Sequence, residues 1–122
     1  DTIRVSLTAD PVEEVRAAHD LLRALGLRRG GARLVSCPTC GRIQYDMLPL
    51  VKEMEEYLKK VRSNITVAVM GCPVNGPGEA KNADIGIAGG NGVGLIFAKG
   101  EIIKKVPEEE LIDALMEEIE KL

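Results

Sequence analysis

The chain has 122 residues, of which 45% are hydrophobic and 29% are charged, and its formal net charge is −3. This composition is typical of a compact globular domain with an aliphatic core, because the aromatic residues are one Phe and two Tyr. Excess negative charge and few aromatic rings argue against nucleic-acid binding, which needs cations for phosphates and rings for base stacking. The sequence also lacks a long apolar run or a signal pattern, so we expect no membrane insertion.

The N-terminal segment has the pattern of one strand followed by one helix. Apolar and polar residues alternate from Thr2 to Thr8, which predicts a β-strand. Asp10 and Pro11 then indicate a helix start, because Asp is a favoured N-cap and Pro is favoured at the first helical position. The helix is predicted to end at Gly26. Its predicted apolar face consists of Val12, Val15, Leu22 and Leu25.

A second strand and helix surround the first two cysteines. Residues 32–36 are predicted to form a short strand that leads directly into Cys37. Asp46 is expected to cap a helix. Residues 65–70 form a nearly continuous apolar run that leads to Cys72, and such a run is typical of a strand covered on both faces. The predicted apolar face of the helix consists of Met47, Leu50, Val51, Met54, Tyr57, Leu58 and Val61.

The C-terminal part is predicted to contain three more strands and one helix. The strands are expected over residues 84–88, 93–98 and 102–106. The glycine-rich stretch 89–94 is followed by a strand, whereas a dinucleotide-binding turn is followed by a helix, so we predict a hairpin connection there. Pro107 is expected to begin the last helix, with three Glu residues in its first turn. The order of elements predicts an α/β fold with a mixed sheet.

The three cysteines are the strongest chemical signal in the sequence. Cys37 and Cys40 form a Cys-x-x-Cys pair, and each cysteine lies beside Pro or Gly in a segment that is predicted to turn. Thiols grouped on turns after strands are typical ligands of zinc, iron or an iron–sulfur cluster. The one histidine, His19, belongs to the first helix and is not expected to be a ligand. An odd number of cysteines favours a reducing compartment, and hence the cytoplasm.

A fourth ligand is not obvious from spacing alone. Glu79 follows Cys72 by seven residues on a segment rich in Gly and Pro, which we expect to be a loop that can fold back toward the thiols. A solvated Glu79 that caps the following turn is the more common outcome for such a residue. A zinc-stabilised structural or interaction domain using the three cysteines and Glu79 therefore stays open. A thiol–disulfide couple of Cys37 and Cys40 is a further alternative, but it leaves Cys72 unexplained.

Three segments resemble a known enzyme family. Residues 36–42 (SCPTCGR), 70–80 (MGCPVNGPGEA) and 83–90 (ADIGIAGG) are similar to the C-terminal part of the bacterial 4-hydroxy-3-methylbut-2-enyl diphosphate synthases. These are 4Fe-4S oxidoreductases of the non-mevalonate pathway of isoprenoid biosynthesis. The resemblance spans the whole chain, since residues 1–7 are similar to the last strand of the family's barrel. The run NGPGE beside two matched cysteine sites makes the resemblance specific.

The resemblance implies a cofactor, a reaction and site residues. The family's cluster ligands correspond here to Cys37, Cys40, Cys72 and Glu79. The family converts 2-C-methyl-D-erythritol 2,4-cyclodiphosphate to 4-hydroxy-3-methylbut-2-enyl diphosphate by two-electron reductive dehydroxylation, with ferredoxin or flavodoxin as electron donor. The iron held by Glu79 would meet the substrate oxygen, and Asn75 would donate a hydrogen bond to the substrate.

The resemblance also implies an architecture larger than this chain. Residues 1–30 would be a remnant of the last strand and helix of a TIM barrel, with Arg4 and Ser6 facing a diphosphate. Residues 31–122 would be a cluster domain similar to the 4Fe-4S half of sulfite and nitrite reductases. The intact enzyme would be a homodimer in which the missing barrel of one subunit faces the cluster domain of the other. We therefore expect no turnover from this chain alone.

Overall fold

The computed structural model describes residues 2–37 and 39–122, except for the side chain of Glu79. The chain divides between Gly30 and Gly31 into two compact units. The first unit contains helix α1, Pro11–Ala24. Asp10 caps it as predicted, since its carboxylate accepts a hydrogen bond of 2.9 Å from the Val12 N–H. Beyond α1, Gly26 adopts a φ of +69°, the left-handed conformation that glycine favours after a helix.

The predicted strand over residues 2–8 is wrong. The described residues of this segment form no regular secondary structure. A strand is stable only when a neighbouring strand satisfies its backbone groups, and the first unit contains no strand that could pair with it. The Leu7 N–H instead donates to a carboxylate oxygen of Glu14 at 3.1 Å. An alternation of apolar and polar residues forms a strand only where a neighbouring strand can pair with it.

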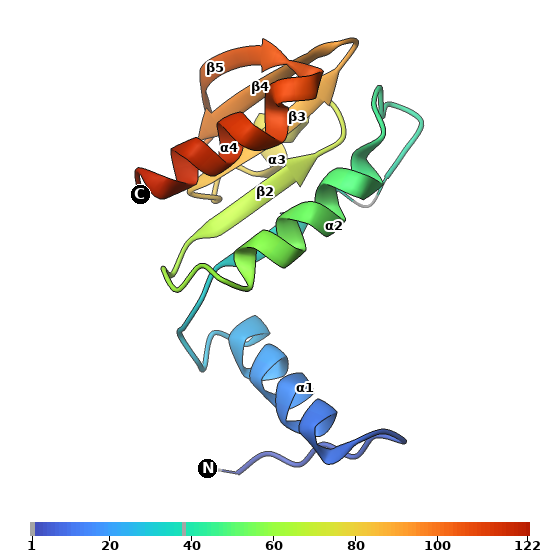
Figure 1. Ribbon diagram of the computed structural model, residues 1–122, viewed down its shortest axis with the longest axis vertical. Coiled ribbons are helices and arrows are strands. Elements are labelled where there is room, and N and C mark those ends of the chain that lie inside the picture. The colour runs from blue at the N-terminus through green and yellow to red at the C-terminus, as the bar shows by residue number, and fades with distance from the viewer. Residues whose placement is uncertain (1, 38) are drawn as a thin grey trace. The chain divides into compact units, whose positions relative to one another are not determined.

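The second unit is built on a five-stranded mixed sheet, which confirms the predicted α/β class (Figure 1). The strands lie in sequence order, so each pairs with its neighbours along the chain. The first three run parallel, and the last two are added as antiparallel hairpin strands. Their bounds are β1 Arg33–Ser36, β2 Thr66–Met70, β3 Ile85–Gly90, β4 Val93–Ala98 and β5 Glu101–Pro107.

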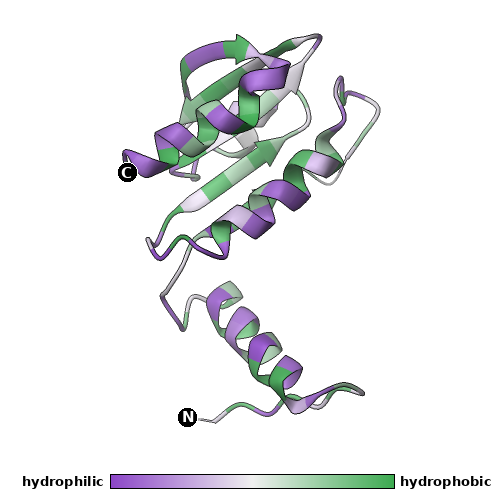
Figure 2. Cartoon of the chain, in the orientation of Figure 1, coloured by the Kyte–Doolittle hydropathy of each residue, from purple (hydrophilic) through white to green (hydrophobic). Residues whose placement is uncertain are grey.

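Two helices cover one face of this sheet and bury the main core. They are α2, Met47–Leu58, and α4, Leu111–Glu120, which is preceded by the 3-10 turn η1, Glu108–Glu110. The last helix thus begins a turn later than predicted. Figure 2 shows β2 mostly green, whereas both helices alternate between green and purple, as expected for elements covered on one side. The largest fully buried side chains are Phe97, Met54, Ile87, Ile96, Leu111, Leu115, Val67 and Val69.

The opposite face of the sheet carries a smaller cluster. Along β2, Val67 and Val69 belong to the main core, whereas Ala68 and Met70 belong to the second cluster with Phe97. This division follows from the two-residue period of a strand. The short helix α3, Gly76–Glu79, packs on this second face against β2 and β3. Both faces of β2 are therefore covered, as its continuous apolar run predicted.

Two hairpin turns join the last three strands, and the first confirms the hairpin predicted in the glycine-rich stretch. Asn91 and Gly92 have φ values of +54° and +80°, and Lys99 and Gly100 have +50° and +86°. Two consecutive residues with positive φ are typical of the tight turns that join antiparallel strands. The glycine-rich stretch is therefore a hairpin, not a dinucleotide-binding turn. Within the described residues, the structure contains no helix of the length and apolar character needed to cross a membrane.

Candidate metal centre

Cys37 and Cys72 follow the carboxyl ends of two neighbouring parallel strands. Ser36, the last residue of β1, is paired with Val69 of β2. The Cys37 N–H donates to the Val69 carbonyl at 3.0 Å, which extends the pairing one residue beyond β1. Cys72 lies two residues after the end of β2. The sheet thus brings two thiol-bearing segments to one edge, where α/β folds place their sites.

Gly71 allows these two segments to approach closely. A Cβ atom built on Gly71 would lie 3.6 Å from the Cys37 sulfur and 2.7 Å from a side-chain carbon of Ile43. Real Cβ atoms essentially never come as close as the second distance, so a side chain at Gly71 would push Ile43 away. The Cys37 thiol therefore lies against the backbone that leads into Cys72. Gly71, directly before Cys72, was the feature of the sequence that pointed to this close approach. The spacing between cysteines does not reveal it.

Cys40 completes the predicted pair on an exposed turn. Its carbonyl accepts a hydrogen bond of 3.2 Å from the Ile43 N–H, which closes the turn after it. Thr39, directly before it, has a φ of +67°. A β-branched residue in this region is strained because its side chain crowds the backbone. The strained conformation lies within the Cys-x-x-Cys pair, so the segment that presents these thiols holds a backbone conformation that costs about 1–3 kcal/mol.

All three cysteines are free thiols, and Cys37 and Cys72 are half-buried. In the part of the chain that the structure describes, no group of three His, Cys, Asp or Glu side chains is arranged so that it could hold a metal ion. The structure therefore places Cys37 beside the Cys72 segment but does not gather a closed ligand set. The donor chemistry nevertheless fits a soft metal or a cluster, because thiols on turns at one sheet edge are soft ligands that bind as thiolates.

The segment after Cys72 is helical, which corrects the prediction of a loop. The Gly76 N–H donates to the Cys72 carbonyl at 3.1 Å, and the Ala80 N–H donates to the Gly76 carbonyl at 3.0 Å. The helix fits on the sheet because Gly76 has no side chain. A Cβ there would lie 2.8 Å from the Met70 Cβ and 3.0 Å from the Ala88 Cβ. Gly76 therefore serves close packing beside Cys72, whereas a Cβ on Gly78 would meet nothing within 4 Å.

The remaining predicted site residues are distributed unevenly. Asn75 is half-buried at the N-cap of α3, and its side chain makes no capping hydrogen bond with the described residues of that helix. Glu79 is the last residue of α3, but its side chain lies outside the described residues. Arg4 and Ser6 are exposed in the first unit. The three cysteines belong to the second unit.

Tyr45 is a site-forming residue that the sequence analysis assigned no role. Its side chain is only 8% exposed, and its hydroxyl donates a hydrogen bond of 2.7 Å to the Met70 carbonyl at the end of β2. Burial is the largest influence on this hydroxyl and raises its pKa far above the usual value. A hydrogen bond with the Gly89 backbone lowers the pKa, and the charges of Cys37 and Glu108 raise it by smaller amounts. The feature of the sequence that could have revealed this role was a single aromatic residue between the cysteine pair and α2.

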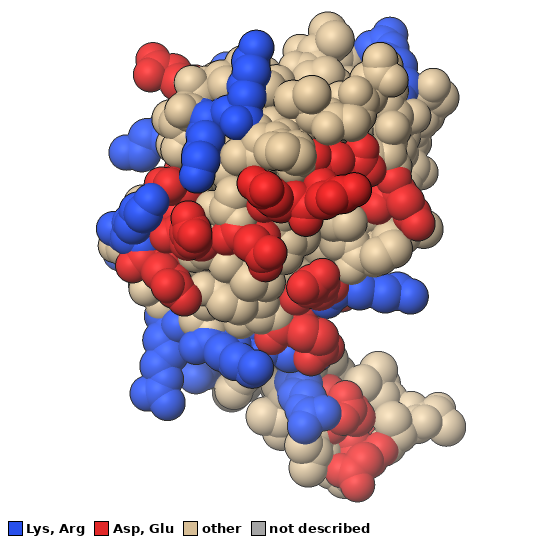
Figure 3. Space-filling view, turned by 45° about the horizontal axis from the view of Figure 1, so that its top comes forward, with Lys and Arg blue, Asp and Glu red and all other residues tan. Residues whose placement is uncertain are grey.

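The second unit has two grooves whose lining residues differ in charge. A groove of about 260 Å³ adjoins Cys72 and is lined by Pro73, Gly90, Val93, Leu95, Ile102 and Lys105. A larger groove of about 770 Å³ lies on the helical face, and its described lining includes five carboxylates, Asp46, Glu53, Glu108, Glu109 and Asp113. Figure 3 shows carboxylates gathered across the middle of the molecule in that view. Of these two grooves, the smaller, mostly apolar one has a residue next to a cysteine, Pro73, in its described lining.

Comparisons with known proteins agree with the site pattern. A family model described as GcpE protein C-terminal domain matches residues 33–121. Over its whole length the chain is 59% identical to the 4-hydroxy-3-methylbut-2-en-1-yl diphosphate synthase (flavodoxin) of Halalkalibacterium halodurans and 57% identical to that of Shouchella clausii. It is also 59% identical to the enzyme of the same name from Clostridium acetobutylicum. The chain spans about a third of these relatives, namely 33%, 33% and 35% of their lengths.

Proposed function

Because the chain belongs to the family described as GcpE protein C-terminal domain, we propose that it is the iron–sulfur domain of a 4-hydroxy-3-methylbut-2-en-1-yl diphosphate synthase. The enzyme would reduce 2-C-methyl-D-erythritol 2,4-cyclodiphosphate to 4-hydroxy-3-methylbut-2-enyl diphosphate, taking up two electrons and two protons and releasing water. The observation that carries the proposal is the placement of Cys37 and Cys72 at neighbouring strand ends in a chain so similar to these synthases. The relatives' names give no support to a zinc-stabilised structural domain.

The ligands of the proposed 4Fe-4S cluster are Cys37, Cys40, Cys72 and Glu79. Cys37 lies beside the backbone of Gly71, and Cys40 is exposed on the turn that follows. The bound cluster would supply single electrons to the substrate. A carboxylate ligand exchanges more readily than a thiolate, which favours Glu79 as the ligand nearest the substrate.

The other residues of the site would bind and orient the substrate. The uncapped amide of Asn75 is half-buried one turn before Glu79, where it can donate a hydrogen bond to a substrate oxygen. The apolar groove beside Pro73 would keep water away from the reacting groups. Arg4 and Ser6 would contact a diphosphate in the intact enzyme, where the segment from residue 2 to residue 8 would gain neighbouring strands. The missing barrel would supply these strands.

The proposed partners follow from the same reading. Flavodoxin is named as a donor in the relatives, so flavodoxin or ferredoxin would deliver electrons to this domain. Residues 1–30 would complete a TIM barrel in the same subunit, and the intact enzyme would be a homodimer in the cytoplasm. The second unit would correspond to the 4Fe-4S half of sulfite and nitrite reductases. We expect no turnover from residues 1–122 alone, because the substrate-binding barrel would be absent.

Anaerobic iron–sulfur reconstitution of the purified chain tests this function. We expect about four irons and four sulfides per chain, the content of a cubane cluster, and an EPR signal after reduction. Cys72→Ala should lose the iron, and Glu79→Ala should change the EPR signal because one iron changes its ligand. Val74→Ala is the matched control, since Val74 is 83% exposed two residues after Cys72. Stoichiometric zinc without iron uptake would instead make the chain a structural metal module.

A further inference from the structure

We propose that Tyr45 is a positioning residue for the cysteine ligands, because its hydroxyl fixes the segment of Cys37 and Cys40 to the strand end that carries Cys72. This inference rests on the proposed function, since it assigns Tyr45 a role at the same metal centre. Tyr45 itself contributes no ligand. It acts on the distance between two ligand-bearing segments that are far apart in the sequence.

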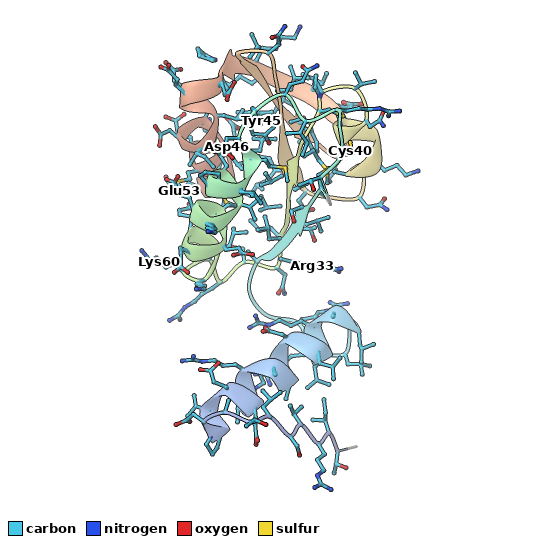
Figure 4. The ribbon with its side chains drawn as sticks, turned by 90° about the vertical axis from the view of Figure 1, so that its right-hand side faces the viewer. Arg33, Cys40, Tyr45, Asp46, Glu53 and Lys60 are labelled. Atoms are coloured by element: carbon cyan, nitrogen blue, oxygen red, sulfur yellow. The ribbon has the colours of Figure 1, made fainter. Side chains whose placement is uncertain are left out.

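The hydrogen bond of Tyr45 connects these two segments directly. Its hydroxyl donates to the Met70 carbonyl at 2.7 Å, across 25 positions of sequence and inside the protein. Met70 ends β2 and lies two residues before Cys72. Tyr45 lies five residues after Cys40, at the point where the cysteine segment enters α2 (Figure 4). One buried hydrogen bond therefore joins the exit of the first ligand segment to the entrance of the second.

The ring of Tyr45 adds a second attachment, to β3. A Cβ built on Gly89 would lie only 2.4 Å to 2.7 Å from three ring carbons, so the ring occupies space that any other residue at Gly89 would fill. Tyr45 thus contacts the ends of two adjacent strands, through its hydroxyl on β2 and through its ring on β3. This double contact fixes the direction of the side chain as well as its depth.

Besides Tyr45, the described part of the cysteine segment is tied to β2 at its start, where the Cys37 N–H donates to the Val69 carbonyl. Between Cys37 and α2, exposed residues predominate, including Cys40, Arg42 and Gln44. Ile43 packs against Gly71. Such an apolar contact limits the distance between the two segments but, unlike a hydrogen bond, does not fix their relative orientation. Hydrogen bonds in the outer shell of a metal site orient the ligands and tune the bound metal. Among the described side chains of this segment, that of Tyr45 combines burial with a directed hydrogen bond to the strand before Cys72.

Tyr45→Phe tests the inference because it removes the hydroxyl and keeps the ring. Tyr57→Phe is the matched control, since Tyr57 is half-buried on α2 and its hydroxyl makes no hydrogen bond with the described residues. In the metal-free chain, we expect Tyr45→Phe to speed amide hydrogen exchange in residues 39–45 roughly 2- to 12-fold, the range for one neutral hydrogen bond. Tyr57→Phe should leave these amides unchanged, and both variants should keep cooperative thermal unfolding.

The loaded protein gives a second readout. After reconstitution, Tyr45→Phe should lose iron faster to a chelator and shift the EPR g-values and reduction potential, whereas Tyr57→Phe should match the wild type. Unchanged exchange, iron retention and potential in Tyr45→Phe would overturn the inference. If the wild type itself takes up no cluster, the proposed function fails, and the exchange experiment still decides whether Tyr45 holds the cysteine segment.

Discussion

Helices α1 and α4 carry the same kind of amphipathic pattern but have different surroundings. None of the residues of α1 is buried, and Val12 and Val15 are each 56% exposed. Five residues of the shorter α4 are buried against the sheet. An apolar stripe therefore predicts that a helix has a partner, but it does not say whether that partner is part of the same folded unit. In the proposed enzyme, the partner of α1 would be the missing barrel.

Shortening one leucine in each helix gives the largest expected difference. Leu115 of α4 is fully buried, whereas Leu21 of α1 is 46% exposed. We expect Leu115→Ala to lower the free energy of unfolding by about 2–5 kcal/mol, because it removes buried methyl groups and leaves a cavity. Leu21→Ala should change it by at most about 0.5 kcal/mol. Urea unfolding measures both, and equal losses would show that the face of α1 is covered in solution.

Two aspartates give a smaller contrast between the same regions. Asp84 accepts a hydrogen bond of 2.8 Å from the Thr66 N–H at the start of β2 and is half-buried, whereas Asp10 caps α1 at the surface. Asp84→Ala should lower the unfolding free energy by about 1–3 kcal/mol, because a shielded N–H loses its acceptor. Asp10→Ala should cost about 1 kcal/mol of helix stability and increase hydrogen exchange in α1 alone. Faster exchange in β2 after Asp10→Ala would contradict this separation.

The smallest expected effect compares two left-handed residues within the second unit. Thr39, in the cysteine segment, and Asn91, in the β3–β4 turn, have φ values of +67° and +54°. Thr39→Gly should raise the unfolding free energy of the metal-free chain by about 1 kcal/mol, since glycine relieves the strain. Asn91→Gly should change it little, because Asn tolerates this conformation. The urea midpoint decides, and a stabilisation by Asn91→Gly of the same size would show that Thr39 is not specially strained.

The strands and helices of the second unit were predictable because each has a partner within the unit. The expected strand over 93–98 matches β4, and the one over 65–70 differs from β2 by one residue. The strand over residues 2–8 failed because its alternation has no neighbouring strand. The helix at Gly76 was missed because glycine and proline suggest a loop, whereas close packing on Met70 and Ala88 selects a helical turn there.

The candidate site was predictable only in part. The positions of Cys37 and Cys72 followed from the two parallel strands that precede them. The contacts that hold their segments together did not, because the Tyr45 hydrogen bond joins residues 25 positions apart. The roles of Asn75, Glu79, Arg4 and Ser6 stay predictions. A pattern of residue types locates potential ligands, while the distances between them depend on packing that only the folded chain reveals.

The register of β2 limits how this chain can change in length over evolution. Val67 and Val69 point to one face and Ala68 and Met70 to the other, so one residue inserted within β2 would turn every later side chain over. The segment of Cys72 would then lose the register that brings Gly71 beside the Cys37 sulfur. The hairpin turns lie beyond the cysteines and impose no such limit. Insertions and deletions among relatives should therefore gather at those turns and avoid β2, which a comparison of their chain lengths would reveal.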